Sequence, residues 1–193
     1  MAHIIFFHHA HGKTEGVEHF ADRLRALGHE VLTPDLYEGQ LFDDLDEGVA
    51  YAQRTGFDVI INRGVDAAAN LAPGYVAMGM SLGCMPAQML AQTGPASKAV
   101  LLHGLVPFEA FGGPWPEGKP FQVHITREDP WEDVPGIEAL LHDVPEGYLY
   151  LYEGDAHLFC DDSMDTYNES YTETVLERIT PFVATTDAGG LLD

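Results

Sequence analysis

The chain has 193 residues and a formal net charge of −22, from 31 acidic and 9 basic side chains. Such an acidic chain is a poor partner for nucleic acid or an anionic membrane, because both require a positive surface. The length predicts one domain with a full hydrophobic core, and no apolar run approaches the ~20 residues of a membrane helix. The acidity fits either adaptation to salt and high solubility or drift of an unconstrained surface.

The N-terminus and the cysteines bear on the compartment. Residues Met1 to Phe7 carry neither a basic segment nor a cleavage signature, so they predict a first strand rather than a signal peptide. The two cysteines, Cys84 and Cys160, are too few for a disulfide framework. We expect a cytoplasmic monomer or small homo-oligomer, with both thiols as small buried side chains. A second nucleophile among them is the alternative.

The predicted elements alternate between strands and helices. In chain order they are a strand at 3–7, a helix at 14–27 closed by Gly28, a strand at 30–33, an acidic loop at 41–48, helices at 49–54 and 59–71, a strand at 75–78, a helix at 85–91, a strand at 98–102, an aperiodic loop at 105–119, a strand at 121–126, a helix at 137–142, a strand at 148–152 and a helix at 166–182. This alternation predicts an α/β domain over residues 1–184, with a doubly wound, mostly parallel sheet. Residues 185–193 are expected to form a flexible tail.

The segment Gly79-Met80-Ser81-Leu82-Gly83 stands between an apolar run and a helical run. Gly-x-Ser-x-Gly in this setting is typical of a nucleophile elbow, a turn so tight that small residues must flank the serine. The turn lifts the hydroxyl above the sheet and points the helix N-terminus at the reaction centre. An ordinary glycine-rich loop is the alternative, but the setting favours Ser81 as a nucleophile.

A serine requires a base, and the base requires a carboxylate that fixes its tautomer. Asp129 follows the strand 121–126, and His157 follows the strand 148–152. Ser81, Asp129 and His157 therefore come in the order Ser, acid, His, each just beyond the carboxyl end of a strand. Glu128 and Asp133 compete with Asp129 for the role of the acid.

An oxyanion hole requires two backbone N–H donors. We assign one to Leu82, directly after the nucleophile. The second should come from the loop after the first strand, His8-His9-Ala10-His11-Gly12, and Ala10 is the candidate.

With these residues in place, the chain resembles the dienelactone hydrolase family of α/β hydrolases over residues 3–184. The resemblance rests on the first loop, on Pro34-Asp35-Leu36-Tyr37, on the elbow, on Asp129 and on Gly154-Asp155-x-His157-x-Phe159. It implies a minimal single domain without a lid, a Ser or Cys nucleophile and no cofactor.

Three departures from the family pattern concern the substrate. Ser81 stands where the founding enzymes have a cysteine, His9 where they have a glutamate that gates the thiol, and Asp161 where they have an arginine that holds a substrate carboxylate. We therefore expect a small neutral ester or lactone rather than an anionic dienelactone. The candidate pocket residues are His9, His11, Tyr37, His103, Trp115 and Asp161; for Trp115, packing on the sheet edge is an equal alternative to roofing the site.

A metal site is the main competing interpretation of this histidine-rich chain. His8, His9, His11 and His103 follow strands that flank the nucleophile, and imidazoles bind zinc and copper well. The chain lacks an HExxH motif, however, and adjacent strand residues point to opposite faces, so we predict no metal. A binding protein that has lost turnover, and an acyltransferase using the same triad, remain alternatives to a serine hydrolase.

Overall fold

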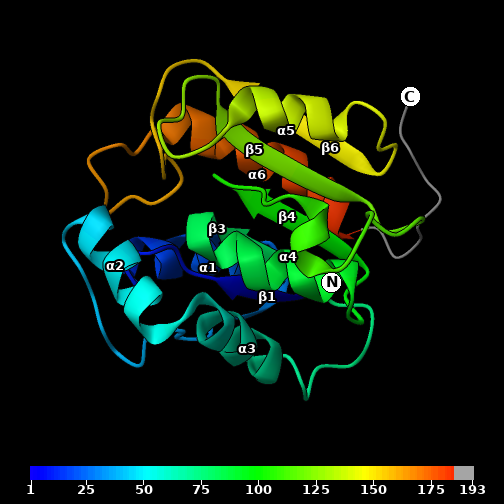
Figure 1. The fold of residues 1–193 in the computed structure, drawn as a ribbon, viewed down its shortest axis with the longest axis horizontal. Coiled ribbons are helices and arrows are strands. Elements are labelled where there is room, and N and C mark those ends of the chain that lie inside the picture. The colour runs from blue at the N-terminus through cyan, green and yellow to red at the C-terminus, as the bar shows by residue number, and fades with distance from the viewer. Residues whose placement is uncertain (185–193) are drawn as a thin grey trace.

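The computed structural model describes residues 1–184, which form one six-stranded, fully parallel sheet between two layers of helices (Figure 1). The strand order is β2-β1-β3-β4-β5-β6. The strands are β1 (His3–Phe7), β2 (Glu30–Leu32), β3 (Val76–Met80), β4 (Lys98–Leu102), β5 (Phe121–Thr126) and β6 (Gly147–Tyr152). The predicted tail at 185–193 lies outside the described residues.

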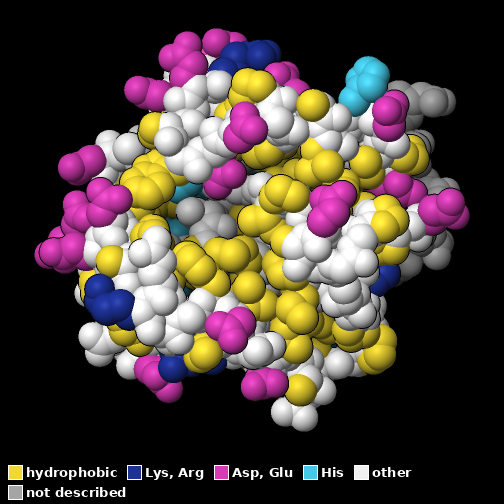
Figure 2. Space-filling model, viewed as in Figure 1, with side chains coloured by type: hydrophobic (Ala, Val, Ile, Leu, Met, Phe, Trp, Pro, Cys, Tyr) yellow, Lys and Arg dark blue, Asp and Glu magenta, His cyan; other side chains and the backbone are white. Residues whose placement is uncertain are grey.

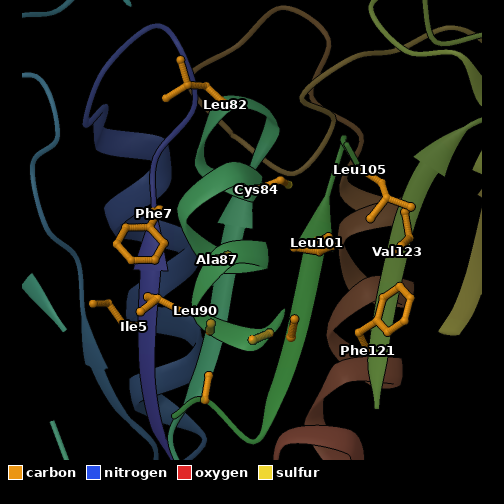
Figure 3. Close-up of a cluster of buried hydrophobic side chains, with 14 of the residues drawn as sticks. Ile5, Phe7, Leu82, Cys84, Ala87, Leu90, Leu101, Leu105, Phe121 and Val123 are labelled. Atoms are coloured by element: carbon orange, nitrogen blue, oxygen red, sulfur yellow. The ribbon is translucent and has the colours of Figure 1, made fainter. Parts of the chain in front are cut away.

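Each strand near the centre sends alternate side chains to the two helical layers, as the two-residue period of a strand requires. In β1, Ile5 and Phe7 join a core with α3 (Phe57–Ala67), α4 (Cys84–Gln92) and α5 (Val134–Leu141), whereas Ile4 and Phe6 join one with α1 (Glu15–Ala26) and α6 (Glu169–Ala184). Figure 3 shows the first of these cores between α4 and the sheet. Because β1, β3 and β4 are buried on both faces, their sequences are nearly continuous apolar runs.

The helix ends follow local sequence signals. The side chain of Thr14 accepts a hydrogen bond from the amide of Val17 and caps α1, as a threonine at this position should. Asp44 likewise caps α2 (Leu45–Thr55) by accepting from Glu47. The predicted acidic loop at 41–48 is therefore wrong in its second half, since the acidic residues 46 and 47 form the first turn of α2, where they favour the helix dipole.

The strand order changes direction between β1 and β3: the chain goes from β1 outward to β2, then crosses back to β3 on the other side of β1 and continues outward to β6. Open α/β sheets bind ligands at the carboxyl ends of the strands beside such a switch point. The elbow follows β3, and the loop His8–Gly12 follows β1, so both lie there. None of the helices within residues 1–184 is both long and apolar enough to cross a membrane.

Candidate active site

The elbow places Ser81 in a strained conformation that only a tight turn produces. Ser81 has a φ of 50°, in the left-handed region that residues other than glycine rarely adopt. A Cβ on Gly79 would lie 2.1 Å from the carbonyl oxygen of Gly83, and one on Gly83 would lie 2.4 Å from that of Phe7. Both glycines are thus required by backbone contacts. A short 3₁₀ segment (Ser81–Gly83) then leads into α4.

Ser81, His157 and Asp129 form a continuous hydrogen-bonded chain. The hydroxyl of Ser81 lies 3.0 Å from Nε2 of His157, and Nδ1 of His157 lies 2.8 Å from Oδ2 of Asp129. Because a carboxylate accepts the Nδ1–H, Nε2 is left unprotonated and accepts from the serine. This is the tautomer that a general base for Ser81 requires.

The carboxylate of Asp129 is fixed by the turn that carries it. Its side chain is fully buried, and Oδ1 also accepts a hydrogen bond from the amide of Trp131. The two competing acids have other surroundings: Glu128 is exposed, and Asp133 accepts from the amide of Gly136 as the N-cap of α5. Of the three acids, the structure therefore brings Asp129 to His157.

The two predicted oxyanion donors lie at the same end of the sheet. Leu82 is the second residue of the 3₁₀ segment, where an amide has no partner within its own helix. Ala10 lies in the loop after β1 and is buried in the same apolar cluster as Leu82. Figure 3 shows Leu82 at the top of α4, beside this loop.

The space-filling view shows where this end of the sheet is open. Figure 2 shows a hollow on the side to which the strands of Figure 1 run, with histidine atoms in its floor and hydrophobic side chains around it. Acidic atoms stand at its edge, and no lysine or arginine borders it on the face shown.

The structure corrects the prediction that Asp161 lines the substrate pocket. Its side chain is fully buried and accepts hydrogen bonds from Nε2 of His9 at 2.7 Å, from the hydroxyl of Thr14 at 2.6 Å and from the amide of Ser163 at 2.8 Å. Burial alone would raise the pKa of Asp161, but these hydrogen-bond donors, His9 first, hold it below its usual range. The carboxylate is thus fully engaged by groups of the protein, and it is not placed to repel a negatively charged substrate.

His9 is committed in the same way. Its Nδ1 accepts from the amide of His11, so the proton is on Nε2, facing Asp161. Burial lowers the pKa of His9 to about 4, which keeps the ring neutral. With both nitrogens engaged, His9 is a structural residue rather than a free pocket group.

Tyr37 and Trp115 are also buried away from the pocket predicted for them. Tyr37 is fully buried, and its hydroxyl donates to the carbonyl of Gly48 in α2. Trp115 packs on Phe121, with ring centroids 3.9 Å apart. Phe121 is the first residue of β5, at the end opposite the triad, so packing on the sheet is the correct alternative for Trp115.

The remaining predicted histidines differ in their surroundings. His11 is nearly buried and donates from Nδ1 to the carbonyl of Phe42. His103 has its ring 5.9 Å from that of His157, is fully buried, and neither of its nitrogens has a hydrogen-bond partner. Burial holds the pKa of His103 well below its usual value, so its ring is neutral beside His157. Within residues 1–184, no group of three or more His, Cys, Asp or Glu side chains is arranged to hold a metal ion.

The thiols are buried, as the small-hydrophobe interpretation predicts. Cys84 lies behind the elbow, with its Sγ 3.3 Å from the carbonyl oxygens of both Gly79 and Leu102, which share its one S–H. Burial raises the pKa of this thiol well above the usual value. Burial raises the pKa of Cys160 as well. Neither thiol is an activated nucleophile, because the thiolate is the reactive form.

The sequence did not predict a second carboxyl group beside the elbow. The carboxyl group of Glu132 faces Gly104: a Cβ added to that glycine would lie 3.1 Å from Oε1 of Glu132 and 3.4 Å from the carbonyl oxygen of Ser81. The only signal was its place in the acidic run after β5, three residues beyond Asp129.

Comparison with known proteins identifies the family of the chain. The sequence model of the Dienelactone hydrolase family matches residues 1–186. A search of the curated proteins finds no significant match.

Solved structures share the fold at low sequence identity. A dienelactone hydrolase-like promiscuous phosphotriesterase from metagenomic libraries superposes with a TM-score of 0.73 at 17% identity, covering 95% of this chain and 86% of that one. Alpha/beta hydrolase domain-containing protein 10 from mouse gives 0.67 at 13%, covering 94% and 89%. A cold-adapted esterase from an Arctic intertidal metagenomic library gives 0.59 at 14%, covering 92% and 82%.

Proposed function

The chain belongs to the dienelactone hydrolase family, and on that premise we propose that it hydrolyses a small neutral ester or lactone through an acyl-enzyme on Ser81. One observation carries the proposal: the hydrogen-bonded chain from Ser81 through His157 to Asp129. The family supports hydrolase activity; the serine nucleophile and the choice of substrate are our inference.

In the first step the oxygen of Ser81 attacks the substrate carbonyl while Nε2 of His157 takes the hydroxyl proton. Asp129 holds the ring in place and stabilises the imidazolium that forms. The carbonyl oxygen becomes an oxyanion, which the amides of Leu82 and Ala10 stabilise. Collapse of this intermediate breaks the ester bond, and His157 returns the proton to the leaving oxygen.

The second step reverses the roles. Water attacks the acyl-enzyme, His157 accepts one of its protons, and the resulting intermediate releases the acid and restores the serine hydroxyl. In a lactone the leaving oxygen stays tethered to the acyl group, so the product is one hydroxy acid. Apart from the substrate and the attacking water, the groups used in both steps belong to the chain.

The placement of positive charge favours a neutral substrate. All nine basic residues lie within residues 1–184, and most bind groups remote in sequence from the triad. Five of them form ion pairs with carboxylates: Lys13, Arg23, Arg25, Arg63 and Arg127. Lys98 and Lys119 donate hydrogen bonds to backbone carbonyls, and Arg178 donates one to the hydroxyl of Tyr152. A substrate carboxylate would have to compete with these partners, and at a net charge of −22 it would also be repelled at long range.

Covalent labelling tests the nucleophile directly. A fluorophosphonate should modify Ser81, found by peptide mass spectrometry, and the Ser81→Ala protein should stay unlabelled. A panel of p-nitrophenyl esters and simple lactones, each paired with a carboxylated analogue, should show higher kcat/KM for the neutral member. Labelling without turnover on any of them would favour a binding protein, and product appearing only with added alcohols would favour acyl transfer.

A further inference from the structure

The turn after β5 places a tryptophan directly beside the triad. Asp129-Pro130-Trp131-Glu132 is a tight turn, in which the amide of Glu132 donates to the carbonyl of Asp129 at 3.4 Å. Proline at the second position restricts the backbone to a conformation that suits such a turn. The side chain of Asp129 also accepts a hydrogen bond from the amide of Trp131 at 2.9 Å. The position of Trp131 is therefore fixed by the triad acid itself.

The ring of Trp131 lies against the ring of the base. Its centroid is 6.1 Å from that of His157, and the angle of 35° between the planes is closer to an offset stack than to an edge-to-face pair. Trp131 is 43% exposed, whereas His157 is 5% exposed, so the indole covers part of the imidazole on its solvent side. Trp131 is also connected to His157 through Asp129, whose Oδ1 accepts a hydrogen bond from both residues.

The titratable groups around His157 leave one charge beside it. On the inner side, the ring centroid of His103 is 5.9 Å away, and burial holds the pKa of His103 well below its usual value, so that ring is neutral. In the turn, burial raises the pKa of Glu132 to about 8, so this neighbour of Asp129 is neutral at pH 7. Within residues 1–184, Asp129 is thus the charged side chain that contacts the base, and the indole is its aromatic neighbour on the open side.

We propose that Trp131 is a positioning residue of the triad, whose indole holds the imidazole of His157 in line with Ser81 and favours its protonated form. The proposal rests on the proposed function. His157 becomes an imidazolium when it takes the serine proton, and the face of an indole attracts a cation more strongly than a neutral ring. The indole therefore stabilises the charged intermediate more than the resting enzyme, which is the condition for accelerating the reaction.

Two substitutions separate this charge effect from packing. Trp131→Phe keeps an aromatic face beside His157, whereas Trp131→Leu keeps an apolar cover without one. Phe57→Leu, the removal of an exposed aromatic ring from the first turn of α3, is the matched control. The measurement is kcat and KM on one neutral ester across the acidic limb of the pH profile, with fluorophosphonate labelling of every variant to show that the triad is intact.

In the Leu variant we expect kcat on the high-pH plateau to fall about two- to fivefold and the pH of half-maximal kcat to fall by about half a unit, with KM unchanged within about twofold. The Phe variant should lie between the Leu variant and the wild type, and the Phe57 control should match the wild type. Equal losses in the Phe and Leu variants would show that the ring acts by packing alone and would overturn the proposal. So would a Leu variant with the wild-type profile, or an effect confined to KM, which would make Trp131 a substrate-binding group.

Fluorescence tests the ring contact without any substrate. A protonated imidazole quenches a neighbouring indole, so the emission of Trp131, taken as the difference between the wild type and Trp131→Phe, should decrease as the pH is lowered from about 9 to about 5. The same difference measured with His157→Gln in both proteins should show no decrease. Emission from Trp131 that does not respond to pH would refute the contact. A protein that shows the quenching but is neither labelled nor active would overturn the proposed function, and the catalytic role of Trp131 with it.

Discussion

His9 and Asp161 are hydrogen-bonded to each other at 2.7 Å although 152 residues separate them in the chain. These are two of the positions at which the chain departs from the pattern of its family, and the structure shows that they form one contact. The pair ties the loop after β1, which carries Ala10, to the loop after β6, which carries His157. We interpret it as a positioning contact that holds a proposed oxyanion donor and the base in register.

Removing the Asp161 charge should destabilise the fold. Asp161→Asn keeps the shape but confronts the Nε2–H of His9 with an amide that supplies one acceptor oxygen instead of two. Because His9 is neutral, the loss is one of hydrogen-bond acceptance to buried donors, which should lower the free energy of unfolding by about 1–3 kcal/mol. Urea denaturation measures it, with the exposed neighbour Asp162→Asn as the control.

The buried position of Asp161 does not accommodate the arginine that the family pattern has there. A Cβ on Gly16 would lie 1.7 Å from Oδ1 of Asp161, so there is no room for a longer side chain. Asp161→Arg should therefore fail to fold or lose stability strongly, rather than gain affinity for anionic esters. A stable Arg variant with improved kcat/KM for a carboxylated ester would contradict this placement of Asp161.

Ser81→Ala should abolish turnover while leaving the fold intact. The change removes the attacking oxygen, and kcat on any ester should fall by a factor on the order of 10³ or more. The free energy of unfolding should change little, because alanine removes one hydroxyl and leaves the backbone in the same left-handed conformation. Activity within tenfold of the wild type would refute Ser81 as the nucleophile.

Asp129→Asn should reduce kcat by orders of magnitude, because an amide can present its N–H to Nδ1 and trap His157 in the wrong tautomer. His157→Ala should cost as much or more. Glu128→Gln serves as the control, since that side chain is exposed and should leave kcat within about twofold. If Glu128→Gln proves the more damaging of the two acid substitutions, Asp129 is not the acid.

The stability of the protein should respond to mild acid through its buried histidines. Burial lowers the pKa of His9 to about 4 and that of His124 to about 3. Between these values and the ordinary value near 6.5, the two imidazoles bind a proton in the unfolded chain but not in the folded chain. Their contribution to stability is thus complete above about pH 6.5 and is lost as the pH falls toward 4.

Comparison of variants isolates this effect from the change in net charge. His124→Gln cannot titrate, so its free energy of unfolding should fall less between pH 6.5 and pH 4.5 than that of the wild type. The difference in slope should approach about 1.4 kcal/mol per pH unit. His142→Gln, at an exposed histidine, should show the wild-type slope. Equal slopes in all three proteins would show that His124 titrates normally.

The sequence alone determined the fold class and the candidate triad, because both depend on local patterns. Gly79 and Gly83 frame Ser81 for steric reasons that a five-residue motif contains, and parallel strands bring their carboxyl ends together. The positions of Asp129 and His157 just after two strands therefore predicted that they would meet Ser81. The hydrogen bonds in the structure agree with that prediction, and their catalytic role awaits the experiments above.

Only the tertiary structure decided which polar side chains face a substrate. Asp161 and Trp115 follow suitable elements but point into the protein, toward His9 and Phe121, because loops pack according to partners remote in sequence. Glu132 illustrates the same point: its carboxyl group fits beside the elbow because Gly104, from another strand end, lacks a side chain there. Such choices depend on burial and direction, which no local pattern of residues encodes.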